Sequence, residues 1–196
     1  MKKALHKGIF GATGSGKTYY ALNTLEESPG RVLFFNPQAE DVDRLMPQAD
    51  WKDNVRAVIE AKRINYVPQT DLEIARLELR RLAQAMMESP WTHTLICDEA
   101  HDFGPQGGSA GPLELVARRG RAKDIVLWAV SVHPADISKT ILRQLRTVVL
   151  FSLPYSSQYL QAYRIPGDEL QELHRKGGEY SFAVWDGLKL TGPHKL

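Results

Sequence analysis

Short apolar runs bounded by turn residues recur along the chain and are the main guide to its secondary structure. Runs of roughly four to eight apolar residues between glycine, proline, asparagine and aspartate are typical of strands buried on both faces. This pattern predicts strands over Ala4–Phe10, Arg31–Phe35, His93–Cys97, Ile125–Ser131 and Val148–Leu153. Two weaker runs, Val55–Ile59 and Ile64–Val67, are also predicted as strands.

Between these runs, apolar positions recur every three or four residues, which is typical of helices with one buried face. The clearest segment is Thr70–Met87, in which Thr70 and Glu73 have the spacing of a capping box and Leu72 begins the apolar face. Strands that alternate with helices favour a doubly wound, mainly parallel α/β sheet. The other predicted helices are Lys17–Glu27, Glu40–Met46, Leu113–Arg119 and Ile137–Leu145.

The 196 residues are expected to form one domain, 1–196, because this length can bury a full core without disulfides or metals. Residues from about 155 to 196 are predicted to form a C-terminal extension. Its segment Leu160–Lys176 has a mixed pattern, whereas Tyr180–Trp185 and Leu188–Leu190 are expected to form a β-hairpin that turns at Asp186-Gly187.

Composition narrows the class of protein only a little. The formal net charge is +2, which permits a nucleic-acid partner without indicating one. The single cysteine, Cys97, excludes an intrachain disulfide and suits a reducing compartment. No run of about 18 apolar residues is present, so we expect neither a membrane span nor a secretory signal. The histidines His6, His174 and His194 have no metal-ligand spacing and are predicted to be solvated.

The stretch from Gly11 to Thr18 has the complete spacing of a phosphate-binding P-loop, between a predicted strand and a predicted helix. Backbone N–H groups of such a loop surround the phosphates of a nucleoside triphosphate. The Lys17 ammonium is expected to reach the β- and γ-phosphates, and the Thr18 hydroxyl to ligate Mg²⁺. The predicted nucleotide-binding residues are Gly11, Ala12, Thr13, Gly14, Ser15, Gly16, Lys17, Thr18 and Tyr19.

A pair of acids, Asp98 and Glu99, follows the apolar strand His93–Cys97 and has the form of a Walker B element. The carboxyl end of a parallel strand is where open α/β sheets bind ligands. Asp98 is therefore predicted to hold Mg²⁺ together with Thr18, and Glu99 to orient or deprotonate the attacking water. An adjacent glutamate favours ATP hydrolysis and an extra strand between the P-loop strand and the Walker B strand, as in RecA-like (ASCE) P-loop ATPases.

Three arginines, Arg118, Arg119 and Arg121, precede the strand Ile125–Ser131. In ring ATPases an arginine of one subunit can reach the nucleotide of its neighbour and stabilise transition-state charge. We expect such a role for this cluster, with Arg119 and Arg121 favoured; a solvated helix end is the alternative. Arg143 and Arg146 are weaker candidates. Ser131, at the end of its strand, is a candidate sensor of the γ-phosphate, or simply a loop serine.

The order of these motifs resembles the HerA–FtsK superfamily of DNA-pumping ATPases. The resemblance covers the P-loop, the strand at Arg31, the sequence Asp98-Glu99-Ala100-His101 and the stretch Arg118–Phe151. Two positions depart from the superfamily pattern. Val132 stands where the superfamily has a glutamine, which shifts attention to Ser131, and Asn36 replaces an aspartate while Glu40 retains the acid for a possible coupling role.

A bare motor of this length is similar to the genome-packaging ATPases of internal-membrane icosahedral viruses with double-jelly-roll capsids. The resemblance implies ATP- and Mg²⁺-dependent translocation of double-stranded DNA into a preformed capsid by a homo-oligomeric ring, a hexamer or a pentamer. It also implies partners at the capsid vertex or in the viral membrane. The expected location is the host cytoplasm, with association with the virion at the packaging vertex.

Three other functions remain open from the sequence. Filamentous-phage assembly or export ATPases share the P-loop and a similar acidic box but often add a membrane span. A P-loop kinase for a nucleotide or metabolite would need a lid and an acceptor pocket, and a nucleotide-gated switch would hydrolyse ATP slowly. For a motor, the glycine-rich segment Phe103–Pro112 is a candidate DNA-contacting loop through Gln106 and Ser109, with a flexible surface loop as the alternative.

Overall fold

The computed structural model describes residues 5–39, 42, 45–104, 111–152 and 155–196. Parts of four sequence predictions lie outside the described residues. These are the start of the first strand at residue 4, most of the helix predicted over 40–46, the centre of the loop 103–112 with Gln106 and Ser109, and the strand end at Leu153.

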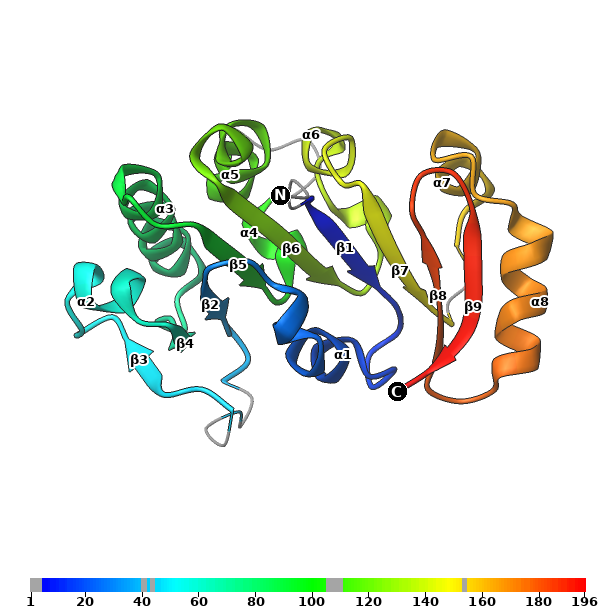
Figure 1. Ribbon diagram of the computed structural model, residues 1–196, viewed down its shortest axis with the longest axis horizontal. Coiled ribbons are helices and arrows are strands. Elements are labelled where there is room, and N and C mark those ends of the chain that lie inside the picture. Colours follow the sequence, from blue (N-terminus) through cyan, green and yellow to red (C-terminus); the bar gives the residue numbers. More distant parts are fainter. Residues whose placement is uncertain (1–4, 40–41, 43–44, 105–110, 153–154) are drawn as a thin grey trace.

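Nine strands of the described chain form one sheet in the order β3-β4-β2-β5-β6-β1-β7-β8-β9 (Figure 1). The strands from β3 to β7 in this order are parallel, whereas β8 pairs antiparallel with β7 and with β9. The bounds are β1 Lys7–Phe10, β2 Arg31–Phe35, β3 Gln48–Asp50, β4 Arg63–Val67, β5 His93–Cys97, β6 Ile125–Ser131, β7 Thr147–Phe151, β8 Ser181–Trp185 and β9 Leu190–Lys195.

The position of β6 between β1 and β5 confirms the predicted extra strand between the P-loop strand and the strand that carries the acids. The mainly parallel α/β fold and the C-terminal hairpin are confirmed as well. The second strand of the hairpin begins at Leu190 rather than at the predicted Leu188, because the Asp186 side chain accepts hydrogen bonds from the Leu188 and Lys189 N–H groups and keeps both residues in the turn. The helices are α1 Lys17–Asn23, α2 Val55–Glu60, α3 Leu72–Glu88, α4 Ala100–Phe103, α5 Pro112–Arg119, α6 Lys139–Leu142, α7 Ser157–Ala162 and α8 Gly167–Gly177, with 3-10 turns at Leu25–Glu27, Gly120–Lys123 and Pro134–Asp136.

Two apolar layers lie on opposite faces of the sheet, as the alternation along β6 shows. Its residues Ile125, Leu127 and Ala129 pack in one layer with buried side chains of α3 and α5. The intervening Val126, Trp128 and Val130 pack in the other layer with buried side chains of α1. Because successive side chains of a strand point to opposite faces, an unbroken apolar run is needed to fill both layers.

The strand predicted over Val55–Ile59 is wrong, because this segment forms the helix α2. Asn54 caps the helix, and its side chain accepts a hydrogen bond of 2.9 Å from the Arg56 N–H. Val58 and Ile59 are buried while the preceding two residues are exposed, a helical rather than an alternating pattern. Sequence analysis also missed the edge strand β3 and the short helix α4.

The helix α3 is confirmed, but its predicted cap is wrong. The N-cap is Asp71, whose carboxylate accepts a hydrogen bond of 3.0 Å from the Ile74 N–H. Glu73 instead pairs with the Arg76 guanidinium at 2.5 Å. Leu72 is 39% exposed, so the buried face begins at Ala75.

Other boundaries differ where local hydrogen bonds tighten the chain. The predicted helix Lys17–Glu27 ends at Asn23, because Thr24 donates its hydroxyl to the Tyr20 carbonyl and a 3-10 turn follows. The helix predicted over Ile137–Leu145 is shortened to α6. The mixed segment Leu160–Lys176 resolves into the end of α7 and most of α8. Among the described residues, no helix combines the length and apolar character needed to cross a bilayer.

Candidate active site

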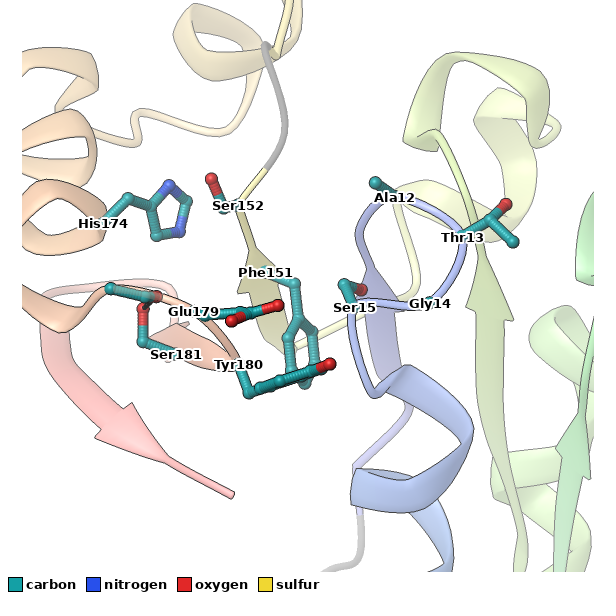
Figure 2. Close-up of a pocket in the computed structure, with 11 residues that line it drawn as sticks. Ala12, Thr13, Gly14, Ser15, Phe151, Ser152, His174, Glu179, Tyr180 and Ser181 are labelled. Atoms are coloured by element: carbon teal, nitrogen blue, oxygen red, sulfur yellow. Dashed lines mark hydrogen bonds between the residues drawn. The ribbon is translucent and has the colours of Figure 1, made fainter.

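The P-loop connects the carboxyl end of β1 to the first turn of α1 (Figure 2). Gly14 and Gly16 have φ of 77° and 96°, in the left-handed region that favours glycine. A Cβ at Gly11 would lie 2.4 Å from the Cβ of Phe151, so this position also requires a glycine. The Lys17 side chain folds back, and its Nζ donates a hydrogen bond of 2.9 Å to the Ala12 carbonyl. The contact between Lys17 and Ala12 therefore joins the first turn of α1 to the start of the loop.

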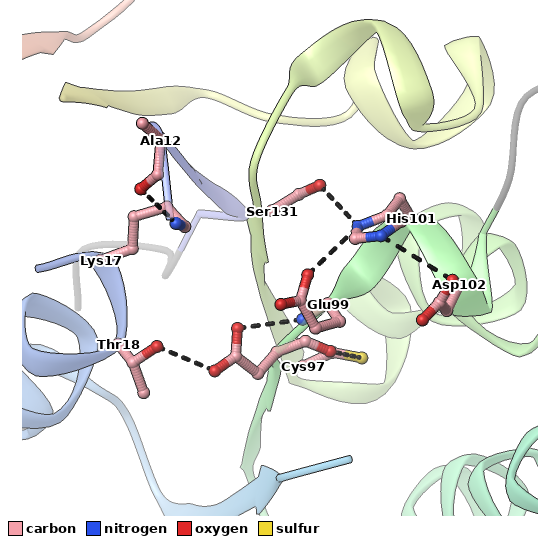
Figure 3. Close-up of polar contacts among 9 residues, drawn as sticks. Ala12, Lys17, Thr18, Cys97, Glu99, His101, Asp102 and Ser131 are labelled. Atoms are coloured by element: carbon pink, nitrogen blue, oxygen red, sulfur yellow. Dashed lines mark hydrogen bonds and ion pairs between the residues drawn. The ribbon is translucent and has the colours of Figure 1, made fainter. Parts of the chain in front are cut away.

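The two predicted metal ligands contact each other across the site. Asp98, immediately after β5, is 4% exposed, and its Oδ2 accepts a hydrogen bond of 2.9 Å from the Thr18 hydroxyl (Figure 3). Its Oδ1 accepts a second hydrogen bond of 2.9 Å from the Glu99 N–H. Burial raises the pKa of Asp98, and these two hydrogen bonds oppose the shift. A hydroxyl and a carboxylate oxygen form a donor set that suits Mg²⁺.

Glu99 occupies a conformation that non-glycine residues rarely adopt. Its φ of 46° and ψ of 44° are left-handed, which costs about 1–3 kcal/mol and is typical of functional sites. The turn starts α4 and directs the chain away from β5. Burial raises the pKa of Glu99, and the neighbouring charge of Asp98 raises it further. Both effects favour a carboxylate that accepts a proton more readily than one in water.

A second contact, missed by sequence analysis, links Glu99 to Ser131. The Nδ1 of His101 lies 3.4 Å from Oε2 of Glu99 and 3.1 Å from Oγ of Ser131 (Figure 3). Ser131 is fully buried at the end of β6, next to β5 and β1. The spacing of His101 two positions after Glu99 was visible in the sequence, but only the fold brings Ser131 to the same imidazole.

Two adjoining pockets surround the P-loop and share Thr13 and Gly14 in their walls. The smaller pocket, of about 250 Å³, is lined by the side chains predicted to bind phosphate and metal and to activate water. It is also lined by Tyr19, which is 60% exposed. The larger, of about 460 Å³, separates the P-loop from the C-terminal extension (Figure 2). The smaller pocket is lined by Thr13, Gly14, Gly16, Lys17, Thr18, Tyr19, Asp98 and Glu99. The larger is lined by Ala12, Thr13, Gly14, Ser15, Phe151, Ser152, His174, Gly178, Glu179, Tyr180 and Ser181.

The predicted arginines lie away from this site within the same chain. Arg118 and Arg119 end α5, and Arg121 lies in the following turn, before the amino end of β6. The P-loop and the two acids lie at the carboxyl ends of the strands, a full strand length away. Arg118 and Arg119 are exposed. The fold therefore brings Ser131 to His101, the neighbour of Glu99, but does not bring the arginines to the P-loop of their own subunit.

Two of the three histidines predicted to be solvated are not. His6 is fully buried; its Nδ1 accepts a hydrogen bond of 2.9 Å from the Leu127 N–H, and its Nε2 lies 3.2 Å from the Ala117 carbonyl. Burial is the main reason that its pKa is lowered to about 4. His174 is partly buried, with its Nε2 3.0 Å from the Leu150 carbonyl. His194 is exposed, as expected. The possible coupling residue Glu40 lies outside the described chain.

Comparisons with known proteins find similar solved structures but no matching sequence family. No family model matches the chain, and no curated protein matches it. The genome-packaging NTPase B204 of Sulfolobus turreted icosahedral virus 2, solved with AMP, superposes with a TM-score of 0.77 at 15% identity, covering 100% of both chains. The DNA-packaging ATPase B204 of Sulfolobus turreted icosahedral virus gives 0.71 at 16% identity, over 99% of this chain and 100% of that one.

More distant likeness extends to two bacterial proteins. The N-terminal domain of zonular occludens toxin from Neisseria meningitidis gives a TM-score of 0.52 at 11% identity, covering 98% of this chain and 87% of that one. EssC from Geobacillus thermodenitrificans gives 0.52 at 15% identity, over 83% of this chain and 34% of that one. The chain thus has, along its whole length, the fold of the B204 packaging ATPases, as the resemblance in its motifs led us to expect.

Proposed function

We propose that this chain is an ATP-hydrolysing motor that translocates double-stranded DNA and packages a viral genome into a preformed capsid. The observation that carries the proposal is the contact of the Thr18 hydroxyl with Asp98 beside Glu99, in a sheet where β6 separates β1 from β5. The full-length likeness to B204, solved with AMP, AMPPCP and ATP-gammaS, supports a nucleotide-driven packaging role.

In this proposal the P-loop N–H groups and the Lys17 ammonium hold the β- and γ-phosphates of ATP in the smaller pocket. Thr18 and Asp98 would hold Mg²⁺, which would supply positive charge to neutralise the phosphates. Glu99 accepts a proton from the attacking water. Its raised pKa suits this role, because a general base works best when its pKa lies near the working pH.

The larger pocket is proposed to receive the base and ribose of the nucleotide. It adjoins the phosphate pocket through Thr13 and Gly14, and the side chains of Phe151 and Tyr180 line it. An aromatic ring offers a base a stacking surface that does not depend on charge. The C-terminal extension would then sense whether the P-loop is occupied.

Arg118, Arg119 and Arg121 are proposed to act in trans on the nucleotide of a neighbouring subunit in a homo-oligomeric ring, a hexamer or a pentamer. Their distance from the P-loop of their own chain suits this role, because only a neighbour could bring them to a γ-phosphate. Contact with capsid-vertex or viral membrane proteins in the host cytoplasm belongs to the same proposal.

The test is steady-state ATP hydrolysis with and without linear double-stranded DNA, over a series of protein concentrations. A ring motor predicts stimulation by DNA, and a specific activity that rises with protein concentration. Arg119→Ala or Arg121→Ala should abolish hydrolysis, and mixing either with Glu99→Gln should restore part of it, because each variant supplies what its neighbour lacks. Hydrolysis that is indifferent to DNA and to concentration would favour a kinase or a switch and refute the motor.

A further inference from the structure

A second large cavity lies at the end of the sheet opposite to the P-loop. Its volume is about 910 Å³, within the range of ligand pockets. It is bordered by α6, α7, the start of β7 and the turn between β8 and β9. These segments gather near the amino ends of the parallel strands, at the top of Figure 1. The P-loop leaves β1 at the opposite, carboxyl ends of these strands. The two sites are therefore separate within one chain.

The cavity is strongly basic. Four of its lining residues are cationic: Lys139, Arg143, Arg146 and Arg164. All four are exposed at its rim, and among the described residues none has a carboxylate within 4.0 Å. Because no carboxylate of the described chain neutralises these side chains, they are available to bind an anionic ligand.

The single carboxylate in the lining does not neutralise this charge. Asp186 lies in the turn between β8 and β9, and its Oδ1 accepts hydrogen bonds of 2.9 Å from the N–H groups of Leu188 and Lys189. Its role is to hold the turn. The cavity consequently keeps an excess of positive charge.

Three aromatic residues also line the cavity: Tyr159, Tyr163 and Trp185. Tyr159 is 6% exposed, and its Oη has no hydrogen-bond partner in the described part of the chain. Because Tyr159 and Trp185 belong to the buried apolar core, the groups that the cavity offers to a ligand are its four cations.

We propose that this cavity binds phosphate groups of a DNA backbone, at a site distinct from the nucleotide pocket. Three of the four cations are arginines, whose planar guanidinium donates paired hydrogen bonds to phosphate oxygens. The choice of DNA as the phosphate-bearing partner rests on the proposed function. A contact to the backbone alone suits a motor, because it carries no sequence preference.

The experiment measures the binding of a short fluorescent DNA duplex, and of the same single strand, by anisotropy between about 50 and 200 mM salt. Lys139→Gln combined with Arg164→Gln should weaken binding and reduce the salt slope by about 2, since each lost phosphate contact removes about 0.9. The charge-matched control is Arg80→Gln combined with Arg81→Gln, on the exposed side of α3, and it should leave the slope unchanged. DNA-free ATP hydrolysis and thermal unfolding should be unaltered in the cavity variant. Lys139→Arg with Arg164→Lys should bind as wild type does.

The outcomes separate this site from the motor itself. If the wild-type protein binds DNA and the cavity variant binds equally well with the same slope, the site is wrong while the motor stands. If both charge pairs weaken binding equally, net charge governs binding and the site is likewise overturned. If polyglutamate of matched charge displaces the duplex as effectively as DNA does, the cavity accepts acidic peptides rather than phosphates. If the wild type binds no DNA, the site and the DNA-translocating function both fail.

Discussion

Single side chains connect the P-loop to the neighbouring strands through a short series of contacts. Thr18 touches Asp98, Asp98 accepts the N–H of Glu99, and His101 lies between Glu99 and Ser131. These residues lie in α1, directly after β5, at the start of and within α4, and at the end of β6. The Glu99 carboxylate is therefore held by contacts that reach two neighbouring strands, β5 and β6, and not by its own turn alone. The left-handed backbone of Glu99 persists because these contacts hold it.

Replacing the proposed base gives the sharpest test at this scale. Glu99→Gln keeps the size of the side chain but cannot accept a proton, so ATP hydrolysis should fall by about 10²-fold or more. Binding of a fluorescent ATP analogue should persist, whereas the matched variant Lys17→Ala should lose tight binding. Turnover near the wild-type rate in Glu99→Gln would refute the assignment.

A positioning role for His101 predicts a different kinetic signature. His101→Ala should lower kcat several-fold and leave KM nearly unchanged, because the nucleotide contacts are intact and only the orientation of Glu99 is lost. His101→Asn places an amide N–H near the position of Nδ1 and should restore part of kcat. An asparagine variant no faster than the alanine variant, or a change confined to KM, would contradict this role.

Secondary-structure elements were predicted well where burial on both faces of the sheet decides them, and poorly where a helix cap decides them. The buried strands β1, β2, β5, β6 and β7 read directly from apolar runs, because both of their faces are covered. The apolar run at Val55–Ile59 was equally short, and the cap at Asn54 made it a helix. A short apolar run has the same periodicity in a strand and in a buried helix turn, so its cap decides.

The N-cap of α3 can be tested by paired variants. Asp71→Ala should lower the free energy of unfolding by about 0.5–2 kcal/mol, because the Ile74 N–H loses its acceptor. Thr70→Ala, the residue favoured from the sequence, should change it by less than about 0.5 kcal/mol. Urea unfolding followed by circular dichroism measures both. A larger effect at Thr70 would return the cap to the position predicted from the sequence.

At the scale of the whole molecule, folding buries the imidazoles of His6, before β1, and of His93, at the start of β5. Burial is the main cause that lowers the pKa of His6 to about 4 and that of His93 to about 4, from 6.5. Between pH 6.5 and about 4 the unfolded chain thus binds protons that the folded chain does not. The stability from these two groups is fully present above pH 6.5 and is lost as the pH falls toward 4.

This linkage predicts that the free energy of unfolding decreases as the pH falls from about 7 to about 4.5. His93→Gln keeps an amide that can contact Ser89, which lies 3.0 Å from the imidazole, and should flatten the decrease. His194→Gln, at an exposed position, is the control and should leave the slope as in wild type. Urea titrations at stepped pH give the slopes, and equal slopes in all three proteins would contradict the prediction.

The sequence alone determined the features that depend on local spacing. The P-loop, the acidic pair after a buried strand and the order of strands and helices follow from nearest neighbours, so they were predictable and led to the fold shared with B204. Tertiary structure decided everything that joins distant segments. Only the packed sheet places Ser131 beside His101 and buries His6. It also places Arg118 and Arg119 at the amino ends of the strands, away from the P-loop, and forms a basic cavity beside α6 and α7. These features arise from contacts between residues far apart in the chain, and no local pattern encodes such contacts.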